Sequence, residues 1–153
     1  MKIGFDMDGV IAMRPRIFKL NHSRGKYRIN LSVFEQWFWT AVMAVRSPSQ
    51  ILVAKILKFK KGGDKLYLVT GRLAFLEKMT WWWLRKHNLT EMFDQVLINT
   101  GNIQPHEFKA RQIIENKIDQ FYEDELFTAK YLRKMTKADI NLVINNGENI
   151  EGL

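Results

Sequence analysis

Two carboxylates follow the first apolar run of the chain. Ile3-Gly4-Phe5 leads directly to Asp6, and Asp8 comes two residues later, just before Gly9. Like charges held this close together cost free energy unless a cation or a reacting group balances them. We therefore interpret Asp6 and Asp8 as the centre of a magnesium-dependent site that handles phosphate groups.

Other polar residues stand where later apolar runs end. Thr70-Gly71-Arg72 follow one run, Glu123-Asp124 follow another, and Lys109 lies early in a predicted helix. Ligands of an open parallel α/β sheet bind beyond the carboxyl ends of its strands, so we expect these residues to converge on Asp6 and Asp8. Mg²⁺ prefers oxygen ligands, which Asp6, the backbone carbonyl near Asp8, and Glu123 or Asp124 would supply. Which of these last two is the inner ligand stays open.

Predicted strands and helices, which could position these residues, alternate along the chain. Short apolar runs predict buried strands over 2–6, 65–69, 95–99, 118–122 and 140–144. Amphipathic or apolar stretches predict helices over 31–45, 49–60, 73–86, 105–115 and 125–135. Strands that alternate with helices predict right-handed crossovers and a parallel sheet, hence an α/β fold.

In this order, the motifs Asp6-Met7-Asp8-Gly9-Val10, Thr70-Gly71-Arg72, Lys109 and Glu123-Asp124 resemble the four motifs of the haloacid dehalogenase-like hydrolases. The resemblance implies a three-layer Rossmannoid fold with a central parallel sheet and a small helical cap insertion. It also implies a phosphatase that uses Mg²⁺.

By this resemblance, each motif residue has a role in cleaving a phosphate monoester. Asp6 would attack phosphorus to form an aspartyl-phosphate, and Asp8 would act as general acid and then as general base. Thr70, Gly71 and Arg72 would bind the phosphate together with Lys109, which would also neutralise charge on Asp6. Arg72 has a second interpretation, in which it pairs with a carboxylate. Dehalogenase members lack an acid at the position of Asp8, so its presence favours phosphoryl chemistry.

One helix gives a weaker likeness. Thr80, Trp83 and Leu84 match the Thr-x-x-Trp-Leu pattern of members similar to polynucleotide 3′-phosphatases. Positions 80, 83, 84 and 87 also form one helix face, so Trp83 and Leu84 are expected in the core. Trp81 and Trp82 cannot both face that core, and we expect one of them to be exposed or at a subunit contact.

Positive charge is concentrated early in the chain. The net charge is +8, and residues 11–61 hold eleven Lys or Arg against the single acid Glu35. We expect residues 1–10 and 63–153 to form the core domain, and residues 11–62 to form a flap hairpin, with its turn at 21–25, plus a small basic helical cap. A basic cap suits a substrate with more than one phosphate, such as a nucleotide or a nucleic-acid end.

Composition excludes several classes. The 153 residues include no cysteine, which removes disulfides, thiolate metal sites and cysteine nucleophiles. No stretch reads as a transmembrane segment and no signal peptide is evident, so we expect a soluble cytoplasmic protein that acts on a phosphorylated small molecule or nucleotide.

Two alternatives stay open. The protein could be an inactive relative whose basic, aromatic cap binds nucleic acid or a protein. The apolar 31–45 helix could form a homodimer interface or contact a membrane surface.

Overall fold

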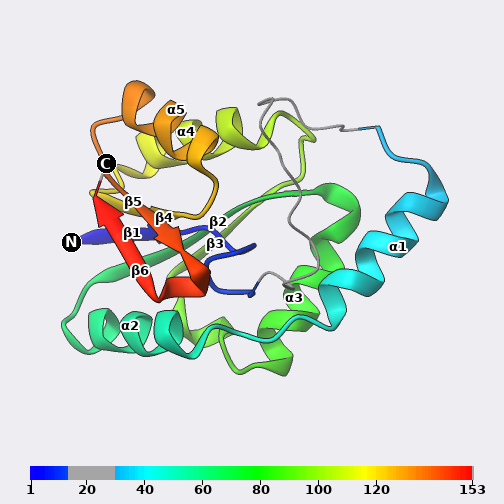
Figure 1. The fold of residues 1–153 in the computed structure, drawn as a ribbon, viewed down its shortest axis with the longest axis horizontal. Helices are drawn as coiled ribbons and strands as arrows, with labels where there is room; N and C mark the ends of the chain where they lie inside the picture. Colours follow the sequence, from blue (N-terminus) through cyan, green and yellow to red (C-terminus); the bar gives the residue numbers. More distant parts are fainter. Residues whose placement is uncertain (14–29, 153) are drawn as a thin grey trace.

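A six-stranded sheet forms the middle of the molecule (Figure 1). The computed structural model describes residues 1–13 and 30–152. The strands lie in the order β3-β2-β1-β4-β5-β6. Their bounds are β1 Lys2–Phe5, β2 Lys65–Leu73, β3 Gln95–Asn99, β4 Gln120–Glu123, β5 Asp139–Ile144 and β6 Asn149–Gly152. The first five pair in parallel, and β6 pairs antiparallel with β5.

Helices cover both faces of this sheet and create the three layers that the motifs implied. Their bounds are α1 Val33–Ala44, α2 Gln50–Lys61, α3 Glu77–Lys86, α4 Pro105–Asn116 and α5 Leu126–Met135. Helices α4 and α5 lie on one side of the sheet, and α2 and α3 lie on the other (Figure 1). The α/β prediction is confirmed.

Each sheet face has its own hydrophobic cluster. On one face, Ile3 and Phe5 of β1 pack with Leu52 and Ile56 of α2 and with Trp83 of α3. On the other face, apolar side chains of the sheet pack against apolar side chains of α4 and α5. Helix α2, which we expected within the insertion, therefore packs with the core strands. The division into core and cap stays a prediction, and this packing favours a boundary nearer residue 48.

Four details differ from the sequence-based expectation. Strand β2 continues to Leu73, with a shift in its pairing between Thr70 and Leu73, so Thr70-Gly71-Arg72 lie inside the strand. A 3₁₀ turn over Ala74–Leu76 precedes α3. Strand β4 begins at Gln120 because α4 ends on Lys117 in the left-handed conformation. Strand β6 was not predicted.

The insertion is described in part. The predicted flap hairpin falls mostly on residues 14–29, which lie outside the described residues. Helix α1 begins at a capping box, in which Ser32 and Glu35 each accept a hydrogen bond from the other's backbone amide. It projects from the side of the sheet layers, near α3 (Figure 1). Among the described residues, no helix is long and apolar enough to cross a membrane.

Candidate functional site

The carboxyl end of β1 places Asp6 beside Lys109, as the motif order predicted. Asp6 directly follows β1, its amide donates to the carbonyl of Tyr122 in β4, and Lys109 is a buried residue of α4. Lys109 Nζ lies 3.1 Å from Asp6 Oδ1 and 2.6 Å from Glu123 Oε2. One buried ammonium therefore bridges the first and fourth motifs.

Three carboxylates gather at this point. Asp6, Glu123 and Asp124 each offer an oxygen, and these oxygens lie within 4.8 Å of one another. Gly9 makes room for the cluster, because it adopts a positive φ of 86° and a Cβ at this position would overlap the Asp124 carboxylate. An all-oxygen donor set with two of its three members buried suits a hard divalent cation.

The pKa values of the clustered side chains are shifted by burial and by their mutual charges. Burial raises the pKa of the Asp6 carboxyl, against the opposing effect of Lys109 and with a further upward contribution from Asp8. Burial, with the charges of Asp6 and Asp124, raises the pKa of Glu123 to about 8 although Lys109 opposes the shift. Burial alone would lower the pKa of Lys109, but Asp6 and Glu123 raise it instead. For both Asp6 and Glu123, burial outweighs the one nearby positive charge, that of Lys109.

Asp8 has a different environment. Arg72 holds its carboxylate with two hydrogen bonds, Nε to Oδ2 at 2.8 Å and Nη2 to Oδ1 at 2.7 Å. Arg46 adds a third, Nη1 to Oδ1 at 2.6 Å. Burial acts to raise the pKa of Asp8, but Arg72 and then Arg46 outweigh burial and hold this pKa well below its usual range. In this conformation Asp8 is a carboxylate clamped between two guanidinium groups.

Arg72 therefore matches the second of its two interpretations, pairing with a carboxylate. It is buried in β2, and its remaining contacts are to Thr80 Oγ1 at 3.2 Å and to Met43 Sδ at 3.5 Å. Thr80, a residue of the Thr-x-x-Trp-Leu pattern, thus supports Arg72. Thr80, Trp83 and Leu84 are buried, whereas Trp82 is 41% exposed, as the helix periodicity predicted.

Arg46 was not among the predicted site residues. It lies between α1 and α2, its side chain is buried, and its carbonyl accepts a hydrogen bond from Trp83 Nε1 at 2.8 Å. No motif marks it. The one local signal is a single basic residue next to the Ser47-Pro48-Ser49 break, which does not reveal that the chain returns to Asp8 there.

Thr70 and Gly71 lie next to this site in β2. Thr70 is fully buried, and its Oγ1 accepts a hydrogen bond from the Arg72 amide at 3.3 Å. A Cβ at Gly71 would collide with Pro105, the first residue of α4, so this glycine lets α4 approach the sheet and brings Lys109 near. The phosphate-binding roles of Thr70, Gly71 and Arg72 stay predictions.

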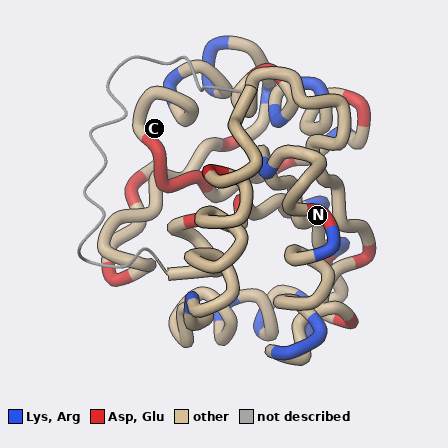
Figure 2. Tube along the Cα trace, turned by 90° about the vertical axis from the view of Figure 1, so that its right-hand side faces the viewer, with Lys and Arg blue, Asp and Glu red and all other residues tan. Residues whose placement is uncertain are grey.

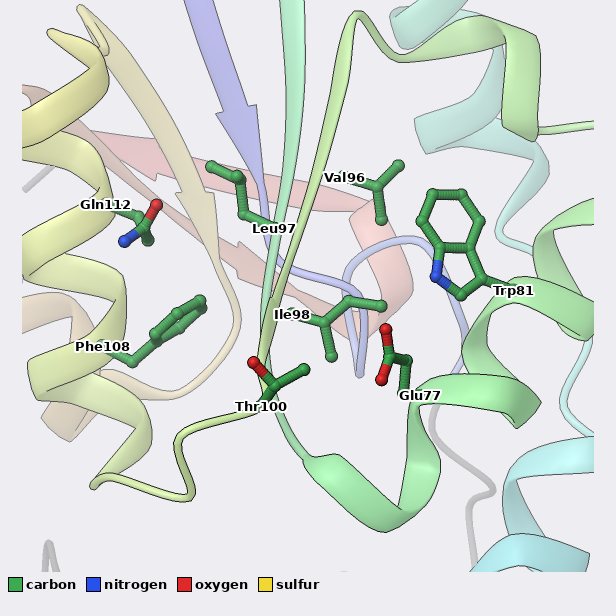
Figure 3. A pocket seen from close by; sticks show the side chains of 8 residues that line it. All are labelled: Glu77, Trp81, Val96, Leu97, Ile98, Thr100, Phe108 and Gln112. Atoms are coloured by element: carbon green, nitrogen blue, oxygen red, sulfur yellow. The ribbon is translucent and has the colours of Figure 1, made fainter.

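A separate cavity of about 320 Å³ lies at the outer edge of the sheet (Figure 3). Trp81 and Glu77 line it from α3, Phe108 lines it from α4, and β3 runs between them. None of the predicted site residues lines this cavity.

Comparisons with known proteins identify the class of fold. No family model matches the chain, and no curated protein matches it in sequence. Solved structures do resemble it. A chain of the Pnkp1/Rnl/Hen1 RNA repair complex superposes with a TM-score of 0.67 at 15% identity, over 97% of this chain and 43% of that one. This protein thus spans less than half of that chain.

Two further structures are covered over most of their length. A haloacid dehalogenase-like family hydrolase from Streptococcus pneumoniae matches with a TM-score of 0.66 at 10% identity, over 94% of this chain and 84% of that one. An L-2-haloacid dehalogenase matches with a TM-score of 0.64 at 12% identity, over 98% and 88%. The chain has the haloacid dehalogenase-like fold.

Proposed function

We propose that this protein is a magnesium-dependent phosphohydrolase that cleaves phosphate monoesters through an aspartyl-phosphate on Asp6. The observation that carries the proposal is the joint placement of Asp6, Lys109, Glu123 and Asp124 at the carboxyl end of β1, with Asp8 two residues farther along. The fold is shared with hydrolases, which supports the reaction class without specifying it.

Charge in the site supports a cation. Its ionisable side chains comprise one carboxylate more than basic groups, namely Asp6, Asp8, Glu123 and Asp124 against Arg46, Arg72 and Lys109. Asp6, Glu123, Asp124 and the backbone carbonyl near Asp8 would hold Mg²⁺, which would turn the excess of one negative charge into a net positive charge that suits a phosphate and would supply Lewis-acid polarisation of a phosphoryl oxygen.

The chain's own residues would then perform the reaction. Asp6 presents an oxygen to phosphorus, and Lys109 holds that carboxylate and offsets its charge during attack. Asp8 would hand a proton to the leaving oxygen and later take one from water. Because Arg46 and Arg72 hold Asp8 as a carboxylate, at least one of these contacts must loosen before Asp8 gains a proton.

We propose nucleotides or nucleic-acid ends as the substrate class, rather than small sugar phosphates. The concentration of basic residues over 11–61 supports it, and so does the likeness to a chain whose structure is described as an RNA repair complex. The competing function is binding of nucleic acid or a protein without turnover, favoured by the same basic residues.

Hydrolysis of an aryl phosphate, with and without Mg²⁺, tests the reaction. Turnover that requires Mg²⁺ and disappears in Asp6→Asn supports the phosphatase, provided that circular dichroism and thermal unfolding show a folded variant. Asp64→Asn is a matched control, since Asp64 lies at the turn before β2 and pairs with the amino terminus. Nucleic-acid binding with a steep salt dependence and no turnover would favour the binding protein instead.

A substrate panel tests the class. We expect 3′-phosphorylated oligonucleotides and nucleotides to be cleaved with a higher kcat/KM than sugar phosphates. The reverse preference would contradict the substrate proposal and leave the phosphatase proposal intact.

A further inference from the structure

Helix α1 carries a large apolar surface that contacts little of the described chain. Trp37 is 68% exposed and Phe34 is 74% exposed, and Val33, Phe38 and Val45 are exposed as well. Positions 34, 37, 38, 41 and 45 recur at helical spacing, so they share one side of the helix, and Ala41 is the small residue among them.

The size of this surface matches a protein interface. With about 150–250 Å² for an aromatic side chain and less for valine, the exposed fractions amount to about 600 Å² per copy. Two copies would bury at most about 1,200 Å², the lower end of the usual range for stable interfaces. The largest apolar patch of an ordinary monomer is about 300–600 Å², so this one lies at the upper end of that range.

The charges of α1 do not suit lipid or nucleic acid. Residues 33–44 contain no Lys or Arg, and their one ionisable group is Glu35. A helix that lies on an anionic membrane carries basic residues on its polar side, and a nucleic-acid surface needs them as well. Figure 2 faces the side from which α1 projects, and both basic and acidic residues are scattered over the described part of the chain in this view.

We propose that the α1 surface, formed by Val33, Phe34, Trp37, Phe38, Ala41 and Val45, docks against the same surface of a second copy of this chain. The two α1 helices would run antiparallel about a twofold axis between Trp37 and Phe38. A parallel arrangement would set Phe34 against Phe34 and Ala41 against Ala41, whereas the antiparallel one sets Phe34 against Ala41, a large side chain against a small one. The antiparallel arrangement also aligns the helix dipoles favourably.

The proposal does not depend on the phosphatase reaction, but it bears on the site. Helix α1 ends at Ala44, and only Val45 separates it from Arg46, whose guanidinium contacts Asp8. Docking of α1 would hold this segment, and hence the clamp on Asp8, in one position.

Sedimentation velocity over a concentration series tests the dimer. We expect the wild-type protein to sediment as a dimer and Trp37→Glu to dissociate at least about tenfold more readily. Ile114→Glu is the control, because Ile114 is also exposed but lies on α4. A wild-type monomer up to about 100 μM would overturn the proposal. So would a Trp37→Glu variant as dimeric as the wild type.

Cross-linking tests the register without relying on a disruptive variant. The chain has no cysteine, so single introduced cysteines report unambiguously. We expect Phe34→Cys mixed with Ala41→Cys to form far more disulfide-linked dimer than either variant alone. Equal cross-linking in all three samples would overturn the antiparallel pairing. Flotation of monomeric protein with anionic liposomes, abolished by Trp37→Glu, would assign the surface to a membrane and overturn the dimer.

Discussion

Arg46 Nη1 lies 2.6 Å from Asp8 Oδ1, which joins the segment between α1 and α2 to the second carboxylate of the first motif. Arg72 contacts the same carboxylate from β2. The carboxylate proposed as acid and base is thus positioned from two parts of the chain. Arg46 belongs to residues 11–62, the segment in which we expect substrate specificity to reside.

Replacing Arg46 separates these two contributions. We expect Arg46→Ala to lower kcat about 10- to 100-fold with little change in KM, because Asp8 would then be held by Arg72 alone and would lose its position when that contact loosens to admit a proton. Added guanidinium should restore part of the lost kcat. An unchanged kcat would show that Arg46 does not position Asp8 for the reaction.

The glycine in the first motif can be tested with a matched pair. Gly9 and Gly63 have nearly the same φ, 86° and 82°, but a Cβ at Gly9 overlaps Asp124, whereas one at Gly63 meets nothing within 4 Å. We expect Gly63→Ala to lower the free energy of unfolding by about 1 kcal/mol, the cost of the left-handed backbone alone. Gly9→Ala should cost more and should also weaken Mg²⁺ binding in calorimetry. Equal destabilisation in both variants would contradict the close packing of Asp124.

Lys109 supplies the one ammonium among the described contacts of Asp6 and Glu123. We expect Lys109→Met to lower the free energy of unfolding by about 3–5 kcal/mol, because it leaves buried carboxylates without their partner. If the cluster binds a cation, Mg²⁺ should raise the Tm of this variant more than that of the wild type. No Mg²⁺-induced shift in the thermal unfolding of either protein would argue against a cation at these carboxylates.

Asp94 gives a prediction outside the site. Its Oδ2 accepts a hydrogen bond from the Leu66 amide at 2.7 Å, and this bond, with Lys60 nearby, lowers the pKa of Asp94. A lowered pKa stabilises the fold above the ordinary carboxyl range, and this stability is lost as the pH falls through the lowered pKa. Because the side chain is 40% exposed, Asp94→Asn should cost less than about 1 kcal/mol at pH 7. Urea unfolding should show this difference shrink below pH 4, and a constant difference would contradict it.

Strand ends were the most predictable part of the site. Asp6, Glu123 and Asp124 follow short apolar runs, and parallel strands bring such positions to one edge of the sheet. Lys109 was predictable because a motif order placed it on the helix before β4. Local pattern and topology were sufficient for the three acids, whereas Lys109 also needed the motif order.

Contacts that depend on tertiary packing were not predictable. The amphipathic pattern of α2 indicated a helix but not that Leu52 and Ile56 would join the cluster beneath β1. Gly71 suggested the end of a strand, yet β2 continues past it to Leu73, which pairs with Asn99 of β3. The short β6 has no apolar alternation and depends on pairing with β5. Arg46 reaches Asp8 only because the segment after α1 returns to the sheet.

Trapping the covalent intermediate tests the central claim most directly. An aryl phosphate with a leaving group that needs no protonation is mixed with the wild-type protein, Asp6→Asn and Asp8→Asn in Mg²⁺, quenched in acid and digested for mass spectrometry. We expect one phosphoryl group on the Asp6 peptide of Asp8→Asn, where hydrolysis of the intermediate lacks its base, and none in Asp6→Asn. Turnover by the wild type with no label on Asp6 in Asp8→Asn, or label on another residue, would contradict Asp6 as the nucleophile.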